Sequence, residues 1–291
     1  MMIPHLLFRL LSRLQGVHGL LQVRKELLLL KLLKRHLSWA EADWSNLYRN
    51  PEVRKNRTIW VMWTQGLDAA PALVQKCCRS IEPYKGDYDV VVLTAENLHQ
   101  YVRLPEHVEQ LYRQKKMGEA HHSDMVRAYL LTQYGGIWRD ATCFQTAAYP
   151  DYVLNSPFFM FSSNQLGGHL SPIVGSNWFI KAEAGNVLLQ KTVNFLCEYY
   201  KRNSKPHNYY IFHLVLSMLV ANDAQCRQMW QSMPYVCNMN PHVFYFQWHK
   251  PYTAQGYAHL LNACFIHKLS YKYEPSLLQG PENMLKHFLI S

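Results

Sequence analysis

Two aspartates and an arginine carry the clearest chemical signal in this sequence. Asp124 and Arg127 are three residues apart, a spacing that places both side chains on one face of a helix. The Tyr-Gly-Gly run at 134–136 ends that helix, because glycine readily adopts the left-handed conformation of a helix C-terminus. Residues 137–139 continue as a short strand, and Asp140 follows at its end. Ligands of open α/β sheets bind outside the carboxyl ends of the strands. Carboxylates and an arginine at that edge can hold hydroxyls, a diphosphate or a divalent metal ion.

The elements that must position these residues alternate between strand-like and helix-like runs. Strands are predicted at 59–63 and 88–94, and helices at 72–80, 95–101, 105–115 and 117–134. Further along, residues 158–162 and 178–182 suit strands that cross the sheet, and 187–200 and 209–220 suit helices. Such alternation is typical of a sheet with helices on both faces. We therefore expect an α/β fold with a mixed, mostly parallel sheet flanked by helices.

The distribution of charge divides the chain into two parts. With 291 residues, of which 49% are hydrophobic, the chain can form one large domain with appendages. Residues 1–40 contain seven basic residues and one acidic residue, and so carry +6 of the formal charge of +10. The sequence predicts a basic amphipathic helical arm with a linker at 1–50 and a main domain at 51–291.

The arm has two interpretations, because leucines recur at helical spacing among its basic residues. It can lie on the anionic inner leaflet of a membrane, where each basic residue contributes about 1 kcal/mol. Alternatively, it packs on the main domain or on another subunit. No segment has the roughly 18 consecutive apolar residues of a membrane span, and the start does not resemble a signal peptide. We expect a cytoplasmic protein that is peripheral to the inner face of the cytoplasmic membrane.

Composition argues against several other classes of protein. Seven cysteines are scattered without a Cys-x-x-Cys pair, which disfavours a disulfide framework or a zinc knot and favours a reducing compartment. The charge outside residues 1–40 is too even for a nucleic-acid track. We predict no nucleic-acid partner, and a protein that only binds anionic membranes through its basic arm is an alternative.

The motif around the two aspartates resembles a pattern of the glycosyltransferases of family 32 and the related capsular polysaccharide synthesis proteins. That pattern is Ser-Asp-x-x-Arg, a hydrophobic helix, and Tyr-Gly-Gly-(Ile or Met)-(Tyr or Trp)-x-Asp. Every element of it is present between Ser123 and Asp140. Other segments resemble family blocks in the same order, at 58–66, 71–81, 176–180, 210–213 and 266–272. The resemblance covers residues 57 to 273 or so.

This resemblance implies the nucleotide-sugar transferase fold called GT-A. It also implies transfer of a hexose from a nucleotide-diphosphate sugar, with UDP-sugars favoured, and retention of the anomeric configuration. The implied acceptor is a surface (capsular) or lipid-linked polysaccharide. A non-catalytic scaffold of the same fold is the alternative in this class.

The resemblance further implies roles for individual residues. Asp124 is expected to contact hydroxyls of the donor sugar, Arg127 the sugar or a phosphate, and Asp140 the ribose and metal shell. These three are the predicted catalytic residues. The other predicted donor-binding residues are Trp63, Gln65, Gly66, Gly136, Trp138, Asn177 and Lys268. Trp63 either stacks on the nucleotide base or belongs to the core, and His213, on an apolar helix, is interpreted as a core residue.

A metal ion is expected, although the motif departs from the family pattern. Family 32 enzymes hold a divalent metal with an Asp-x-Asp triplet, and here the triplet is Asp140, Ala141 and Thr142. Mn²⁺ and Mg²⁺ prefer oxygen ligands. We expect one of them to be held by Asp140, Thr142 and a late residue, His267. The alternative is that Lys268 and Arg127 neutralise the donor diphosphate without a metal.

Overall fold

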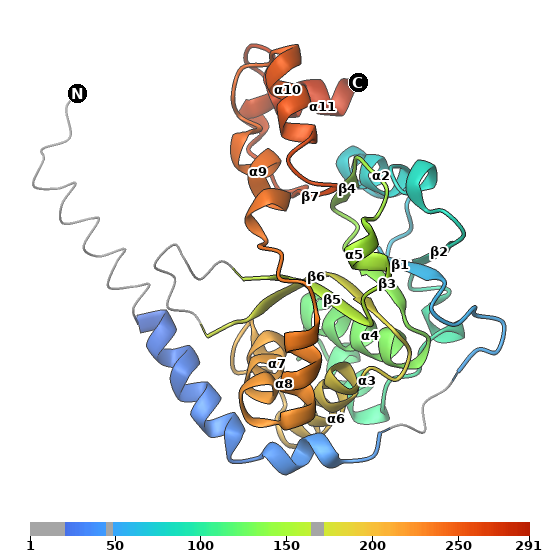
Figure 1. Cartoon of the computed structure of the whole chain (residues 1–291), viewed down its shortest axis with the longest axis vertical. Coiled ribbons are helices and arrows are strands. Elements are labelled where there is room, and N and C mark those ends of the chain that lie inside the picture. The colour runs from blue at the N-terminus through green and yellow to red at the C-terminus, as the bar shows by residue number, and fades with distance from the viewer. Residues whose placement is uncertain (1–20, 45–48, 164–171) are drawn as a thin grey trace, which may run out of the picture.

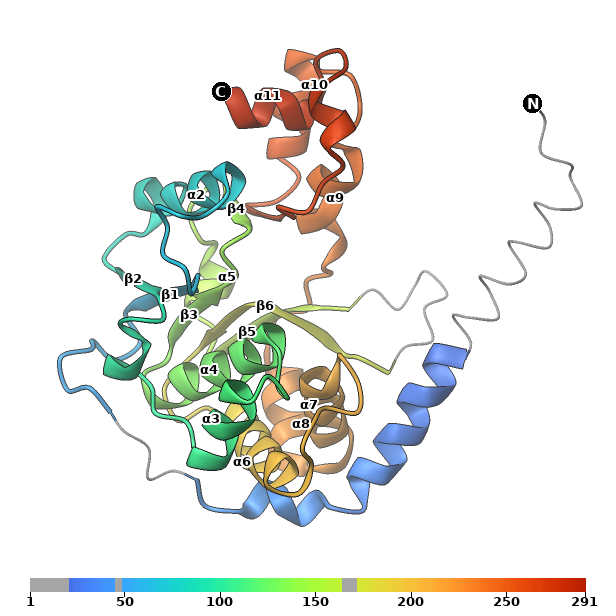
Figure 2. The same cartoon turned by 180° about the vertical axis from the view of Figure 1, so that it is seen from behind.

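The computed structural model describes residues 21–44, 49–163 and 172–291, and a five-stranded mixed sheet lies at its centre (Figure 1 and Figure 2). The strand order is β2-β1-β3-β6-β5, with bounds β1 (Thr58–Met62), β2 (Asp89–Leu93), β3 (Gly136–Arg139), β5 (Phe158–Ser162) and β6 (Gly175–Ala182). β1 pairs in parallel with β2 and β3, whereas β6 is antiparallel to β3 and β5. In this sheet β6 alone therefore runs against the other strands.

Alternate side chains of the strands enter two apolar layers, one on each face of the sheet. Trp60 and Trp138 point into the larger layer, which is filled by α3 (Glu106–Arg113), α4 (Glu119–Gln133), α6 (Val187–Arg202), α7 (Ile211–Asn222) and α8 (Ala224–Ser232). Ile59 and Ile137 point into the other layer, which packs on α2 (Ala72–Arg79) and α5 (Asp151–Leu154). Figure 1 shows the two groups of helices on opposite sides of the sheet. The predicted α/β fold with a mixed sheet flanked by helices is confirmed.

The C-terminal segment forms a third apolar cluster on the outer side of α2. It contains α9 (Met239–Gln247), α10 (Ala254–Leu261) and α11 (Met284–Ile290), which pack on Leu73 and Cys77. Two short strands, β4 (Cys143–Gln145) and β7 (Ile266–Lys268), pair antiparallel at its base. Because β4 follows β3 closely, this pairing carries late residues of the chain to the carboxyl end of β3.

Short 3-10 helices connect several elements: η1 (Leu37–Glu41), η2 (Glu82–Tyr84), η3 (Leu98–Gln100) and η4 (Pro275–Leu278). The helix predicted at 95–101 is only the η3 turn, and the Asn97 side chain explains the difference. Its Oδ1 accepts a hydrogen bond from Thr94 N–H at 2.8 Å, and its Nδ2 donates to the Val92 carbonyl at 2.9 Å. Such side-chain bonds offer the backbone an alternative to the helix.

Two glycines bring the motif helix and β3 close to β1. Gly135 and Gly136 have φ angles of +67° and +96°, which only glycine adopts without strain. A Cβ atom on Gly136 would lie 2.1 Å from the Thr58 carbonyl oxygen, so the two backbones are in direct contact. The tight turn therefore ends α4 and sets β3 beside β1, with Asp140 at the edge that β1 also reaches.

The N-terminal part of the described chain packs on the main domain. A helix over residues 21–34 leads to η1, and Leu33 and Ala40 are buried in the larger apolar layer. Asn194 Nδ2 of α6 donates a hydrogen bond of 3.0 Å to the Ala40 carbonyl. Packing on the main domain, one of the two interpretations of the arm, therefore holds for residues 33–40. The predicted boundary at residue 50 stays a prediction, and residues 1–20 and 45–48 of the predicted arm and linker lie outside the described residues.

The outward face of the helix over residues 21–34 is apolar and basic. Leu21, Leu28 and Leu32 are exposed, and Lys25 and Lys31 are exposed beside them. Across 21–44, 49–163 and 172–291, no helix combines the length and apolar character that a bilayer crossing requires.

Candidate active site

A cavity of about 360 Å³ opens at the carboxyl ends of β1 and β3. These strands are parallel neighbours, so their carboxyl ends meet at one edge of the sheet, which brings Trp63 and Asp140 to the same cavity. The predicted site residues that line it are Trp63, Gln65, Asp124, Arg127, Trp138, Asp140, Thr142, Asn177 and Lys268. The α/β architecture therefore gathers most of the residues that the sequence singles out.

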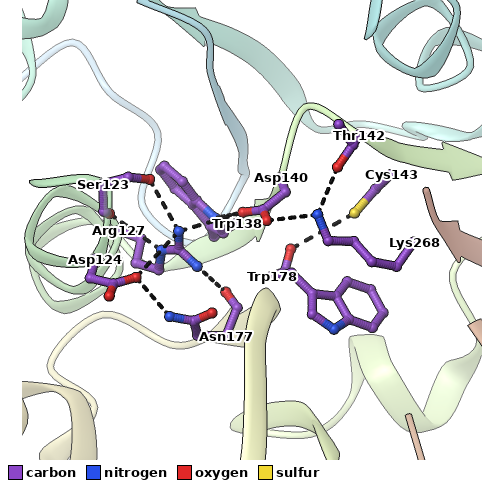
Figure 3. A network of polar contacts seen from close by, with 10 residues as sticks. All are labelled: Ser123, Asp124, Arg127, Trp138, Asp140, Thr142, Cys143, Asn177, Trp178 and Lys268. Carbon is purple, nitrogen blue, oxygen red and sulfur yellow. Dashed lines mark hydrogen bonds and ion pairs between the residues drawn. The ribbon is translucent and has the colours of Figure 1, made fainter. Parts of the chain in front are cut away.

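Arg127 is the centre of a polar network in this cavity (Figure 3). Its guanidinium donates hydrogen bonds to the Ser123 hydroxyl at 3.1 Å and to the Asn177 carbonyl at 2.6 Å. Nη2 also lies 3.4 Å from Asp124 Oδ1 and 3.5 Å from Asp140 Oδ1. A permanent positive charge is therefore fixed between the two carboxylates, and its rigid fork keeps the orientation of all three groups.

Trp138 supports this network from β3. The Arg127 guanidinium carbon lies 4.9 Å from the centre of the Trp138 ring, within cation–π distance. Trp138 Nε1 donates a hydrogen bond of 3.2 Å to Asp140 Oδ1. The indole therefore contacts the arginine through its face and the aspartate through its edge.

Asp140 lies between two positive charges. Its backbone N–H bonds to the Trp178 carbonyl of β6 at 2.8 Å, which fixes the residue at the sheet edge. Oδ2 lies 3.0 Å from Lys268 Nζ, while Arg127 approaches Oδ1 from the other side. Burial alone raises the pKa of Asp140, but the charges of Lys268 and Arg127 outweigh burial and hold the pKa below its usual value. The carboxylate is therefore ionised at neutral pH.

Lys268 reaches Asp140 because of the pairing between β4 and β7. In that register Lys268 stands opposite Cys143, and Leu269 N–H bonds to the Thr142 carbonyl at 3.0 Å. Lys268 Nζ donates to Thr142 Oγ1 at 2.6 Å as well as to Asp140. Burial opposes the charged ammonium, but the Asp140 carboxylate outweighs this effect and raises the pKa of Lys268. The ammonium is thus fixed over the turn that follows β3.

Asp124 differs from Asp140 in its protonation. Only 8% of the residue is exposed, and Oδ1 accepts a hydrogen bond of 2.7 Å from Asn177 Nδ2. Burial raises the pKa of Asp124 to about 7, against the opposing charge of Arg127 and with a further contribution from Asp140. Near neutral pH this carboxyl group exchanges between a hydrogen-bond donor and an acceptor.

Aromatic rings form one wall of the cavity. Trp63 follows β1 directly, and its ring meets that of Tyr271 edge to face, with centroids 5.3 Å apart. Trp63 Nε1 is buried without a hydrogen-bond partner among the described residues. Gln65 also lines the cavity, whereas Gly66, at φ +80°, closes the turn through a bond to the Trp63 carbonyl and does not line it.

His267 and Gly136 do not lie where the sequence placed them. Neighbouring residues of a strand point to opposite faces, so His267 points away from the side on which Lys268 meets Asp140. His267 Nε2 contacts the Leu261 carbonyl at 3.1 Å, and burial lowers the pKa of the ring to about 4. Gly136 serves the close contact with β1 and does not line the cavity. The structure therefore leaves His267 and Gly136, like Gly66, outside the cavity that the other predicted site residues line.

The described residues do not fit the expected Mn²⁺ or Mg²⁺ site. No group of three or more histidine, cysteine or acidic residues could hold a metal within the described ranges. Asp140 and Thr142, the two remaining predicted ligands, are both bound by the Lys268 ammonium. Mg²⁺ requires near-octahedral oxygen ligands at about 2.0–2.1 Å, and an ammonium lies where such an ion would approach the pair.

Several cavity residues are not among the predicted site residues, and Ser123, Tyr209, His213 and Tyr271 are four of them. Ser123 belongs to the motif and accepts a hydrogen bond from Arg127. Tyr209 lies just before residues 210–213, and Tyr271 lies within residues 266–272; both line the cavity. A single aromatic residue in such a segment gives no periodic signal. His213 was interpreted as a core residue, yet it lines the cavity, its Nδ1 has no partner in the described part of the chain, and burial lowers its pKa to about 3. It is therefore a neutral imidazole with a free ring nitrogen.

Comparisons with known proteins identify the family. The model described as capsular polysaccharide synthesis protein matches residues 18–288. Comparison with curated proteins gives no match. Among solved structures, the chain is similar to one titled PaToxG Glycosyltransferase, with a TM-score of 0.42 and 14% identity over 74% of this chain and 86% of that chain. Because the family match spans most of the sequence, this chain belongs to the capsular polysaccharide synthesis protein family.

Proposed function

We propose that this protein is a glycosyltransferase of the GT-A type, which moves a hexose from a nucleoside-diphosphate sugar to a capsular or lipid-linked polysaccharide. The observation that carries the proposal is the set of groups that line one cavity. Lys268 and Arg127 flank Asp140, and Asp124 lies on the other side of Arg127 (Figure 3). Trp63 and Tyr271 line the same cavity. A nucleotide-sugar donor carries a base, a diphosphate and a sugar, and the rings, the cations and the acid can match these three parts. Membership of a polysaccharide synthesis family supports this assignment.

Each part of the donor has a matching group in the cavity. Trp63 and Tyr271 offer aromatic surface and an unpartnered indole N–H to the base, and UDP is the favoured nucleotide by resemblance to family 32. Arg127 and Lys268 supply positive charge for the two phosphates. Asp124 accepts hydrogen bonds from sugar hydroxyls when it is ionised, while Arg127 and Asn177 hold its position.

The reaction that these groups support is the transfer of the sugar at C1. The bond between C1 and the β-phosphate oxygen breaks, and its electron pair stays on that oxygen. The acceptor hydroxyl oxygen forms the new bond to C1, and its proton passes to the departing diphosphate. Fixed positive charge stabilises the leaving group as negative charge develops on it, because no reorganisation is needed at the moment of reaction. Retention of configuration follows from the family 32 resemblance alone.

We also propose that the helix over residues 21–34 holds the protein on an anionic membrane surface at the inner face of the cytoplasmic membrane. Exposed leucines lie beside exposed lysines on its outward face. Such a face buries apolar side chains at the lipid boundary while its charges attract anionic headgroups. A lipid-linked acceptor would be presented at the same surface.

A thermal-shift screen tests the proposed donor. The purified protein is heated with UDP, GDP, CDP, ADP and dTDP and with their hexose conjugates. A ligand at about one hundred times its dissociation constant adds about 2.7 kcal/mol to stability, so one nucleotide series should raise the melting temperature by several degrees. Trp63→Ala should remove that shift, while Tyr235→Ala, at an exposed aromatic residue outside the cavity, should keep it.

The same screen separates the proposal from a non-catalytic scaffold. Release of free nucleoside diphosphate from the stabilising sugar conjugate identifies an enzyme. Binding without any turnover, in the presence of water and of oligosaccharide acceptors, identifies a scaffold. Absence of a shift with every nucleotide contradicts the proposed function altogether.

A further inference from the structure

We infer that the Lys268 ammonium takes the place of the divalent cation in this site, so that the donor diphosphate binds and reacts without a metal ion. The inference rests on the proposed sugar transfer and specifies how its leaving group is stabilised. Three observations carry it: the position of Nζ, the charges around Asp140, and the rigidity of the strands that hold Lys268.

Lys268 Nζ binds the two side-chain oxygen atoms that this motif could offer to a metal ion. Asp140 Oδ2 and Thr142 Oγ1 are the two oxygen atoms that the motif offers, and Nζ bonds to them at 3.0 Å and 2.6 Å (Figure 3). A lysine ammonium has three N–H donors. Two of them have these partners within the described ranges, which leaves the third for a phosphate oxygen in the cavity that Lys268 lines.

The charges around Asp140 favour a diphosphate without a metal. The carboxylate already lies between the positive charges of Lys268 and Arg127. A divalent ion bound to Asp140 would meet the repulsion of both, at separations of a few ångströms inside a partly buried site. A diphosphate anion, in contrast, meets two cations, whose charge is opposed by the Asp140 carboxylate and by Asp124, which is only partly ionised near neutral pH.

The rigidity of the β4–β7 pair makes the ammonium a fixed group. Cys143 stands opposite Lys268, and the Leu269 N–H bond to the Thr142 carbonyl ties the strand to the turn of the motif. Thr142 replaces the second acid of the Asp-x-Asp triplet, and its hydroxyl accepts a hydrogen bond from Lys268. During transfer the electron pair of the C1–O bond moves to the β-phosphate oxygen, and Lys268 stays protonated while it donates a hydrogen bond to that oxygen.

Calorimetric titration tests the inference on the wild-type protein, without reliance on any variant. UDP, GDP, CDP and dTDP are titrated into EDTA-treated protein, first in EDTA and then with 5 mM or so Mn²⁺ or Mg²⁺ in place of EDTA. We expect the best nucleotide to bind with dissociation constants that agree within threefold in the two conditions. An affinity at least tenfold higher with metal would overturn the inference and leave the proposed function standing. Absence of binding in both conditions would overturn the proposed function, and the inference with it.

Variants assign the effect to Lys268. Lys268→Met should weaken binding in EDTA at least tenfold, and Lys268→Arg should recover part of the loss. Lys250→Met is the control, because this exposed lysine contacts Gln247 and does not line the cavity. The double variant Thr142→Asp, Lys268→Ala restores the Asp-x-Asp triplet and should bind nucleotide at least tenfold better with Mn²⁺ than in EDTA. Unchanged affinity of a folded Lys268→Met protein in EDTA would overturn the inference.

Discussion

Asn177 Nδ2 donates a hydrogen bond of 2.7 Å to Asp124 Oδ1, and this bond joins β6 to the motif helix α4 across one wall of the cavity. The same residue binds Arg127 through its backbone carbonyl at 2.6 Å. Asn177 thus binds both the aspartate and the arginine of the Ser-Asp-x-x-Arg motif. Asn177 is a positioning residue, because its side-chain amide donates the hydrogen bond that holds Asp124.

Asn177→Asp should therefore weaken donor binding at least tenfold. The change keeps the size of the side chain but replaces a hydrogen-bond donor by a second carboxylate, and two buried carboxylates in contact disfavour each other's ionisation. The melting temperature should also fall. Asn262→Asp, at an exposed position at the end of α10, serves as the control and should change neither quantity. Calorimetric titration with the nucleotide that wild type binds most tightly measures the affinity of each variant. Equal affinities of Asn177→Asp and Asn262→Asp would contradict the role assigned to Asn177.

Asp124 should make the protein less stable as the pH rises from about 4 to about 7. Its pKa is 3.8 in an unperturbed chain and about 7 in the folded protein. Between these values the folded state retains a proton that the unfolded state releases, so the free energy of unfolding falls with rising pH. One pKa unit corresponds to about 1.4 kcal/mol. The stability of Asp124→Asn relative to wild type should therefore increase by about 3 kcal/mol between pH 5 and pH 8.

Urea unfolding at the two pH values measures this difference. The comparison between pH values matters more than the stability of the variant at either pH, because Asp124→Asn also removes a partner of Arg127. A difference between variant and wild type that stays constant from pH 5 to pH 8 would contradict the raised pKa.

Gly136→Ala should destabilise the protein by more than about 3 kcal/mol or prevent folding. Its φ of +96° strains any other residue, and the added Cβ would lie 2.1 Å from the Thr58 carbonyl oxygen, which is backbone and has no room to move. Gly86→Ala is the control, because Gly86 also has a positive φ of +59° but faces open space. That variant should lose only about 1 kcal/mol. Similar losses in urea unfolding would show that the contact with β1 contributes little.

Charge reversal on the helix over residues 21–34 should release the protein from membranes. Lys25→Glu with Lys31→Glu reverses two exposed charges on the outward face, each of which contributes about 1 kcal/mol at an anionic surface. Co-sedimentation with vesicles of phosphatidylcholine and phosphatidylserine should decrease at least tenfold. Lys116→Glu with Lys205→Glu changes the net charge equally at exposed sites elsewhere. Equal losses in both double variants would mean that net charge acts without a specific face.

The central motif could be predicted from the sequence because its signals are local. The three-residue spacing of Asp124 and Arg127 fixes their shared helix face, and the Gly-Gly break indicates where α4 ends. β1 and β3 are buried strands with adjacent carboxyl ends, which places Trp63 near Asp140. These predictions depend on the spacing of side chains along helices and strands and on turns, and a few consecutive residues determine both.

The partner of Asp140 could not be predicted in the same way. Lys268 is 128 residues away, and it arrives through two three-residue strands that are too short to give a periodic signal. A shift of one residue in such a strand exchanges the side chains on its two faces. In this segment the sequence predicts His267 as a metal ligand and Lys268 as a donor-binding residue, and the strand register places Lys268, not His267, on the side that faces the motif.

The central claim is that this cavity transfers a sugar from a nucleotide donor and that Asp140 is essential to the reaction. The most direct measurement is the release of free nucleoside diphosphate from a panel of nucleotide sugars, followed by mass spectrometry for wild type and Asp140→Asn. Asp140 holds the Arg127 and Lys268 cations that stabilise the leaving group. Losing a preorganised electrostatic contribution typically lowers the rate by about 10²–10³. We predict release by wild type and a loss of that size in a folded Asp140→Asn protein, with Asp151→Asn on α5 as an unaffected control. Release by Asp140→Asn at the wild-type rate, or no release from any donor by wild type, would contradict the account.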